Sequence, residues 1–247
     1  MRRDSLQRLN AARRKRLAVV LLTDFGGEEH IFLEGDPVEP PFAALVEGAF
    51  RSGRSMAFDT IDASGFLNVY VPAPRIAVIG AVHISQYLTP MARLAGFDVR
   101  IIDPRTAFAT RDRFPDVQMC TDWPVDALMA DPLDRYAALV ALTHDPKIDD
   151  FPLAEALRTG CFYIGALGSR KTHAARIGRL AAYGFGADTL STIHAPIGLD
   201  IGASNPAEIS VAILAEVIKA LRTSCRQTVP AERLRRGSPS DDDADGK

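Results

Sequence analysis

Cysteine and aromatic residues are scarce in this chain, which has 3 cysteines among 247 residues and an aromatic content of 7%. The cysteines are odd in number and widely spaced, so they provide neither a disulfide framework nor the paired spacing of a zinc site. This usage is typical of a protein in a reducing cytoplasm. Cys120 and Cys161 stand on or beside apolar segments, where most cysteines are small buried hydrophobes.

A strong charge of one sign and long apolar runs are also missing. The net charge is −2, with 47% hydrophobic and 24% charged residues, which is a globular composition without an overall attraction to nucleic acid. No apolar run approaches the roughly 18 residues that a membrane-spanning helix needs. The basic N-terminus lacks an apolar stretch followed by a cleavage site, so we predict no secretory signal and no stable membrane insertion.

Residues 1–73 predict a small α+β domain with a basic leading helix. Residues 1–16 carry leucines at helical spacing among many arginines, which indicates a solvated helix face or, alternatively, a surface for an anionic partner. The domain boundary is expected after residue 73, because Pro72-Ala73-Pro74 breaks the pattern. The other expected elements are strands at 17–23, 30–33, 55–59 and 66–71, a helix at 40–52 and a turn at Ser64-Gly65.

Residues 74–225 predict an α/β domain: a Rossmann-like parallel sheet with helices on both faces, since strands and helices alternate. The expected strands are 75–80, 98–103, 117–120, 136–143 and 161–166, and the expected helices are 83–95, 149–159, 169–183 and 206–222. Asp149 and Ser169 are candidate N-caps, and Asn205 with Pro206 and Glu208 opens the last helix. Residues 226–247 end in an acidic run and are expected to be disordered.

The first strand–helix turn of this domain carries part of a dinucleotide fingerprint. Gly80 and His83 flank it, and Asp103 ends the next strand about 20 residues on, where a ribose-binding acid would stand. Val82 occupies the second glycine position of the fingerprint, where a side chain obstructs a pyrophosphate. The turn therefore supports the fold more than nicotinamide binding, and a tight turn without a ligand remains the alternative.

Two further polar segments follow the second and the most apolar strands. Arg105 lies just past Asp103, so it can bind a phosphate or pair locally with that acid. Thr143, His144 and Asp145 stand where open α/β sheets bind ligands, with His144 as a candidate proton carrier or a structural loop residue.

Two glycine-bearing segments complete the candidate site. Gly165, Gly168, Ser169, Arg170 and Lys171 lead from a strand into a helix, where free N–H groups and two cations favour an anion. The alternative is helix capping alone. The loop at 196–203 is apolar yet holds Gly198, Asp200 and Gly202, which is typical of a loop that closes over a flat ligand or of a packed crossover.

Together these segments resemble the XdhC/CoxI family, the maturation factors of molybdenum hydroxylases such as xanthine dehydrogenase and carbon monoxide dehydrogenase. The matching stretches cover most of residues 75–222: they are 103–105, 113–115, 143–145, YIGALGSR at 163–170, PIGLDIGA at 196–203, 205–209 and Ala215-Glu216. The two long motifs, in this order and spacing, are specific. The resemblance implies a Rossmann-type C-terminal domain.

The chain departs from the family pattern in two places. The first turn reads Gly-Ala-Gly-His in the family, whereas residues 80–83 read Gly-Ala-Val-His. The family's Ser-Ala-Pro-Arg and Gly-Gly-Gly-Cys motifs are missing from residues 17–74, so no cofactor-ligating cysteine is carried over. The chain therefore resembles a divergent member with a reduced N-terminal domain.

The resemblance implies a cofactor-binding chaperone rather than a catalyst. It implies transient binding of molybdenum cofactor, as molybdopterin or its dinucleotide, and help in its sulfuration and insertion into an apo-hydroxylase. It also implies contact with a cysteine desulfurase, and a homodimer is a further expectation. The cofactor's phosphate would lie at Gly168–Lys171, with His83, His144 and Asp200 lining the pocket.

Two other hypotheses remain open. One is a nicotinamide-dependent oxidoreductase that uses Asp103 on the ribose and His144 as acid or base. The other is a scaffold in a maturation complex that binds no cofactor itself. A sulfur-carrying or molybdenum-ligating role for Cys120 is a further alternative to simple burial.

Overall fold

The computed structural model describes residues 1–60 and 64–224. Its contacts divide the described chain into two compact units. The first consists of Met1–Ala12 and Ala18–Tyr70, and the second of Arg13–Leu17 and Val71–Ser224. The tail 226–247, expected to be disordered, lies outside the described residues.

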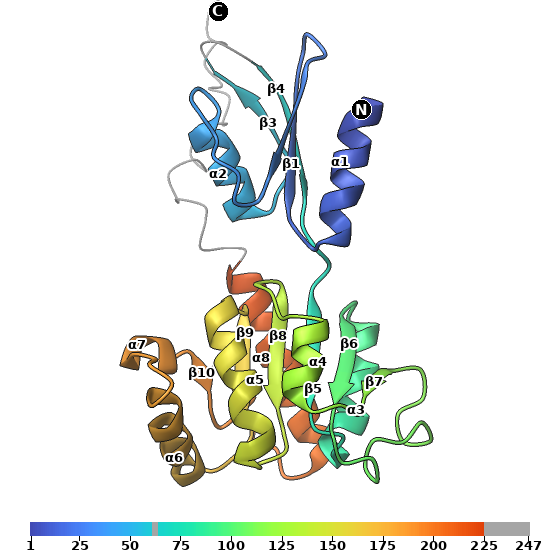
Figure 1. The fold of residues 1–247 in the computed structure, drawn as a ribbon, viewed down its shortest axis with the longest axis vertical. Coiled ribbons are helices and arrows are strands. Elements are labelled where there is room, and N and C mark those ends of the chain that lie inside the picture. Colours follow the sequence, from blue (N-terminus) through green and yellow to red (C-terminus); the bar gives the residue numbers. More distant parts are fainter. Residues whose placement is uncertain (61–63, 225–247) are drawn as a thin grey trace, which may run out of the picture. The chain divides into compact units, whose positions relative to one another are not determined.

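The N-terminal unit is a four-stranded antiparallel sheet with the order β2-β1-β4-β3. Its strands are β1 (Val19–Asp24), β2 (Glu29–Leu33), β3 (Met56–Asp59) and β4 (Ser64–Tyr70), and its helices are α1 (Arg3–Arg14) and α2 (Ala43–Ser52). Helix α2 packs on β1 and β4 around a small apolar core that includes Val20, Leu22 and Leu67. The expected small α+β fold is thus observed (Figure 1).

The expected turn at Ser64-Gly65 is wrong, because both residues belong to β4 and pair with β3. A Cβ on Gly65 would lie 2.2 Å from the Thr23 carbonyl oxygen and 3.0 Å from the Phe58 ring. The glycine therefore allows close approach of neighbouring strands, which is the other common reason for glycine inside a strand.

The second unit is a six-stranded sheet with the order β10-β9-β8-β5-β6-β7, and all its pairings are parallel. The strands are β5 (Arg75–Ile79), β6 (Asp98–Ile102), β7 (Gln118–Cys120), β8 (Ala137–Ala141), β9 (Tyr163–Ala166) and β10 (Ile193–His194). This confirms the Rossmann-like prediction. The chain runs outward from β5 to β7 and then restarts at β8, on the other side of β5.

Helices cover both faces of the parallel sheet (Figure 1). On one face lie α3 (His83–Leu94) and α8 (Pro206–Ser224), and on the other α4 (Pro124–Ala130), α5 (Pro146–Thr159) and α6 (Arg170–Ala181). The short α7 (Ala187–Leu190) precedes β10. In β5, Ile76 and Val78 pack into the first core, whereas Ala77 and Ile79 pack into the second. This alternation explains why the strands read as continuous apolar runs.

The helix caps agree with the sequence in two cases and differ in one. Ser169 accepts the Thr172 N–H at the start of α6, and Asn205 accepts the Glu208 N–H at the start of α8. Helix α5, however, is capped by Asp145 and not by Asp149, which lies four residues later in the first turns of the helix. Over the described parts of the chain, every helix is too short or too polar to cross a membrane.

Candidate functional site

The turns after β5, β6, β8 and β9 share one edge of the sheet, because the strands are parallel. The strand order reverses between β5 and β8, where the chain leaves for one side and returns on the other. Open α/β sheets bind ligands at the carboxyl edge beside such a reversal. Most of the sequence-predicted site residues follow these four strands, so this edge is the candidate site.

The Gly80–His83 turn joins β5 to α3 at the reversal. Gly80 has a φ of +115°, and a Cβ there would lie 2.8 Å from the Thr143 Cγ2 atom, so glycine is required. Val82 is extended, and its side chain packs partly against the core and makes no cap bond to α3. The leading N–H groups of α3 thus lack a side-chain cap from the preceding residue, which suits them to an anion. His83 is exposed at this helix start.

Asp103 is fully buried and fully bonded within the protein. Its Oδ2 accepts the Ala81 N–H at 2.7 Å and Arg105 Nη2 at 2.8 Å, and its Oδ1 accepts the Arg105 N–H and Nε, both at 2.9 Å. Burial raises the pKa of this carboxyl, but the bonds from Arg105 and Ala81 outweigh it and leave the pKa below its ordinary value.

The four bonds change the interpretation of Asp103 and Arg105. A carboxylate offers about four acceptor positions, so Asp103 has none left for a ribose hydroxyl. Arg105 likewise uses Nε and Nη2 on this acid, so that edge of its guanidinium does not bind a phosphate. The pair instead fixes the first turn through the bond from Ala81. This arrangement agrees with the alternative in which Arg105 pairs locally with Asp103 and does not bind a phosphate.

Two of the three residues after β8 have structural partners. Thr143 Oγ1 donates to Asp149 Oδ1 at 2.7 Å and accepts the Asp145 N–H at 3.1 Å, and Asp145 accepts the Lys147 N–H at 3.0 Å as the cap of α5. His144 is different: it is exposed and has a φ of +62°. Partial desolvation of the imidazole and the nearby Arg176 charge lower the pKa of His144 below its ordinary value.

The glycine turn after β9 lies beside His144. A Cβ on Gly168 would lie 3.7 Å from His144 Nδ1 and 3.2 Å from Thr172, and Gly168 has a φ of +144°. Ser169 caps α6, whereas Arg170 and Lys171 are exposed at its start. Gly165 serves packing, because a Cβ there would lie 2.5 Å from the Tyr163 hydroxyl.

The loop after β10 is held from α8 by Glu216. Glu216 Oε2 accepts the Gly198 N–H at 2.8 Å and the Tyr163 hydroxyl at 2.7 Å, and Oε1 lies 2.9 Å from His194 Nδ1. Gly198 has a φ of +92° and lies against α8, while Asp200 and Gly202 are exposed on the loop. Sequence reasoning identifies Glu216 only as part of a family motif and misses this bridging role.

Sequence reasoning also misses two buried charged residues behind the β8 and β9 turns. Asp149 is 1% exposed and Arg176 is 2% exposed. The sequence pattern marks Asp149 only as a helix cap and does not single out Arg176. The signal that could have identified them is their position on the helix face that packs against the sheet. A single sequence does not show which charged positions of a helix lie on that face and which lie on the exposed face.

The thiols of Cys120 and Cys161 are not activated. Burial raises the pKa of Cys161 to about 11 and also raises that of Cys120, whose thiol lies 3.4 Å from Asp122 Oδ2. The thiolate is the reactive form, so both groups are protonated near neutral pH. This environment favours simple burial over a sulfur-carrying role for Cys120.

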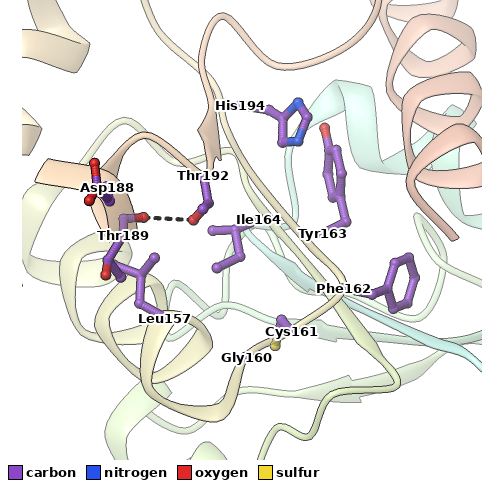
Figure 2. Close-up of a pocket in the computed structure, with 10 residues that line it drawn as sticks. All are labelled: Leu157, Gly160, Cys161, Phe162, Tyr163, Ile164, Asp188, Thr189, Thr192 and His194. Atoms are coloured by element: carbon purple, nitrogen blue, oxygen red, sulfur yellow. Dashed lines mark hydrogen bonds between the residues drawn. The ribbon is translucent and has the colours of Figure 1, made fainter. Parts of the chain in front are cut away.

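A pocket of about 650 Å³ lies away from the candidate site, at the amino-terminal part of β9 and near α7. Figure 2 shows the His194 and Tyr163 rings side by side at one end and Cys161 at another, with Thr189 on α7 bonded to Thr192 just before β10. None of the sequence-predicted cofactor residues lines it. The helix starts and the exposed cations of the candidate site therefore lie at the carboxyl edge of the sheet and not in this pocket.

Comparison with known proteins places this domain in a family. Residues 76–217 match the family model of the XdhC Rossmann domain. The chain is 33% identical over 155 residues to a Bacillus subtilis protein named as a probable xanthine dehydrogenase subunit, covering 62% of this chain and 45% of the relative. It is 28% identical over 155 residues to the molybdenum cofactor insertion chaperone PaoD of Escherichia coli, covering 62% of this chain and 42% of the relative.

A third relative, the uncharacterized Escherichia coli protein YqeB, is 26% identical over 156 residues, which are 63% of this chain and 29% of the relative. The matched region thus spans less than half the length of these curated relatives. A crystal structure titled as a xanthine dehydrogenase from Bacillus halodurans superposes with a TM-score of 0.63 at 24% identity, covering 93% of this chain and 70% of that one, and shows the same fold. Since the XdhC Rossmann match spans more than half of the chain, the chain belongs to the XdhC family.

Proposed function

We propose that this chain is a maturation factor that binds molybdenum cofactor and assists its sulfuration and insertion into a molybdenum hydroxylase. The observation that carries the proposal is the XdhC Rossmann match over residues 76–217, and the similarity over 155 residues to the insertion chaperone PaoD supports it. The cofactor is the cargo of such a protein, and in the recipient enzyme it supplies a redox-active metal.

The carboxyl edge of the parallel sheet fits the phosphate of this cofactor. Helix α3 starts without a side-chain cap from Val82, and α6 starts with Arg170 and Lys171 exposed. The two helices follow β5 and β9, which are two strands apart and so separated by about 10 Å. N–H groups at a helix start together with cations are a good anion site, and each of these two helix starts offers a place for the phosphate.

Each residue of this edge has a proposed task. Arg170 and Lys171 attract and hold the anionic end of the cofactor at the Gly168 turn. His83 and His144 border the same edge, where an imidazole can donate or accept a hydrogen bond. Asp200 and the 196–203 loop, fixed by Glu216, cover the ligand from the side of β10.

The proposal includes partners that supply and receive the cofactor. An apo-hydroxylase would receive it, and a cysteine desulfurase would supply sulfur, because the protonated thiols of Cys120 and Cys161 are poor sulfur carriers. A cytoplasmic site of action, a homodimer and a separate N-terminal domain up to residue 73 also belong to this proposal.

Gel filtration with released molybdenum cofactor tests the binding claim. We expect the protein to retain the cofactor, and we expect the double variant R170E/K171E to lose most of it. A control for the effect of a charge reversal elsewhere is Lys219→Glu, which reverses an exposed charge on α8 away from the carboxyl edge. Failure of the unmodified protein to retain oxidised or reduced cofactor would overturn the binding claim.

Two outcomes would select the other hypotheses. Co-purification with a hydroxylase or desulfurase in the absence of bound cofactor would select a scaffold. Micromolar nicotinamide binding in calorimetry would select an oxidoreductase, which the four bonds of Asp103 disfavour.

A further inference from the structure

Buried polar atoms without a partner are concentrated behind the β8 and β9 turns. Within residues 1–60 and 64–224, six buried side-chain nitrogen or oxygen atoms have no hydrogen-bond partner. Four of the six lie in this one place: Asp149 Oδ2, His173 Nδ1, Arg176 Nε and Arg176 Nη1. Leaving buried polar atoms unpaired is costly, and such groups with perturbed pKa values are characteristic of functional sites.

Arg176 reaches from α6 to the glycine turn. Its Nη2 donates to the Leu167 carbonyl oxygen at 3.0 Å, immediately before Gly168. Gly168 is confined between Thr172 and His144, so the turn has little room to shift. Arg176 therefore acts as a positioning residue, and its positive charge stands directly behind the turn that leads to Arg170 and Lys171.

Asp149 is the buried acid that faces this guanidinium. Burial raises the pKa of Asp149 to about 6, although the bond from the Thr143 side chain, the Arg176 charge and the backbone N–H groups of Thr143 and His144 lower it. No ion pair closer than 4.0 Å joins the two residues in the described chain, although each influences the other's pKa. The carboxyl group is thus poised to change charge near neutral pH.

Other charges also act on this acid or on its partner. Arg179 on α6 pairs with Asp150. The charges of Asp145 and Asp149 both contribute to raising the pKa of Arg105, which follows β6. His144 and His173 have pKa values lowered by burial and by Arg176. Lys147 lies on the same helix as Asp149. A titration of Asp149 must therefore be distinguished from the titration of these neighbouring groups.

We propose that Asp149 and Arg176 form a proton-linked support for the anion site at Gly168–Lys171, in which Asp149 takes up a proton when an anion binds. This inference rests on the proposed function, because it assumes that the start of α6 receives the phosphate. Asp149 and Asp150 both act on the Arg176 charge, so a neutral Asp149 leaves that charge less compensated behind the turn and strengthens the positive potential there. By linkage, a bound anion raises the affinity of Asp149 for its proton by the same factor.

Site-specific NMR titration of the full chain tests the coupling. The probe is sulfate, a dianion that does not titrate between about pH 5 and about pH 8, compared with sodium chloride at matched ionic strength. The signal is the side-chain carboxyl carbon of Asp149, assigned from its loss in Asp149→Asn. We expect saturating sulfate to raise the Asp149 pKa by about half a unit to one unit, which corresponds to an affinity about three- to tenfold higher below the transition.

Two variants locate the effect. In R170E/K171E, sulfate should bind more weakly and the Asp149 pKa should no longer respond to it, whereas Lys219→Glu should behave like the unmodified protein. In Asp149→Asn, the sulfate affinity at about pH 8 should rise to the value that the unmodified protein reaches at acid pH.

The outcomes distinguish this inference from the proposed function. Sulfate binding that leaves the Asp149 pKa unmoved, or an Asp149 that titrates near its ordinary value, would overturn the coupling and leave the anion site intact. No sulfate binding at all would contradict the anion site itself and the coupling with it.

Discussion

The substitution Asp103→Ala should destabilise the Rossmann unit more than any change at its surface. It removes a fully buried carboxylate that accepts four hydrogen bonds, and it leaves the Arg105 guanidinium and the Ala81 N–H without their acceptor. Breaking a buried charged pair from one side costs about 3–5 kcal/mol. For a unit of this size that loss corresponds to a fall in Tm of roughly 6–20 °C.

Urea unfolding monitored by circular dichroism measures the effect, with Asp98→Ala as the matched control. Asp98 is an exposed carboxyl at the amino end of the same strand, so its loss should change the free energy of unfolding by at most about 0.5 kcal/mol. The pKa of Asp103 is lowered in the folded state. Its stabilisation is therefore present above the unfolded pKa and is lost as the pH falls through the folded pKa. The two proteins should converge in stability at acid pH.

An Asp103→Ala protein as stable as the unmodified chain at pH 7 would refute this reasoning. It would mean that the four bonds contribute no net stability, and that the carboxyl is kept for a ligand after all. The free energy of unfolding of Asp103→Asn should lie between those of the unmodified protein and Asp103→Ala. An amide keeps one acceptor oxygen, but its NH₂ group faces the remaining donors and cannot accept from them.

Three further changes should have measurable consequences. Gly80→Ala should lower the free energy of unfolding by about 1–3 kcal/mol in urea titration, because its φ of +115° is strained for alanine and its Cβ meets Thr143 at 2.8 Å. Glu216→Ala should cost about 2–3 kcal/mol and speed amide exchange in residues 196–203, and unchanged exchange would contradict the bridging role. Asp149→Asn should remove a pH dependence: the raised pKa of about 6 means that the unmodified protein loses about 2–4 kcal/mol as the pH rises from about 4 to about 7. Parallel stability curves for this variant and the unmodified protein would count against the raised pKa.

Local sequence patterns are enough to predict the alternation of strands and helices. The strands of the parallel sheet are buried on both faces, so they read as apolar runs, and the helices that follow them start at recognisable caps such as Ser169 and Asn205. The same patterns miss the short elements α4, α7 and β10. These contain 7, 4 and 2 residues, too few for a periodic pattern to emerge.

The partners of the polar site residues are not predictable from local spacing. Asp103 accepts from Ala81, 22 positions earlier, and Glu216 accepts from Tyr163, 53 positions earlier. A sequence shows which polar residues follow the strands or lie on the helices, but it does not show which of them form hydrogen bonds within the fold. Thr143 and Asp145 are therefore supports of the turn, whereas His144 projects from it with a positive φ.

The valine at position 82 illustrates how a motif residue can change while the turn is kept. Its backbone is extended, with φ −92° and ψ 177°, a conformation that requires no glycine, and its side chain packs partly against the core. The two features that shape the turn are retained: the positive φ of Gly80 and the Asp103 bond to Ala81. The N–H groups at the start of α3 therefore keep their orientation toward the carboxyl edge. What the valine changes is how closely a ligand can approach the backbone, so the proposed function assigns the main phosphate contact to the start of α6.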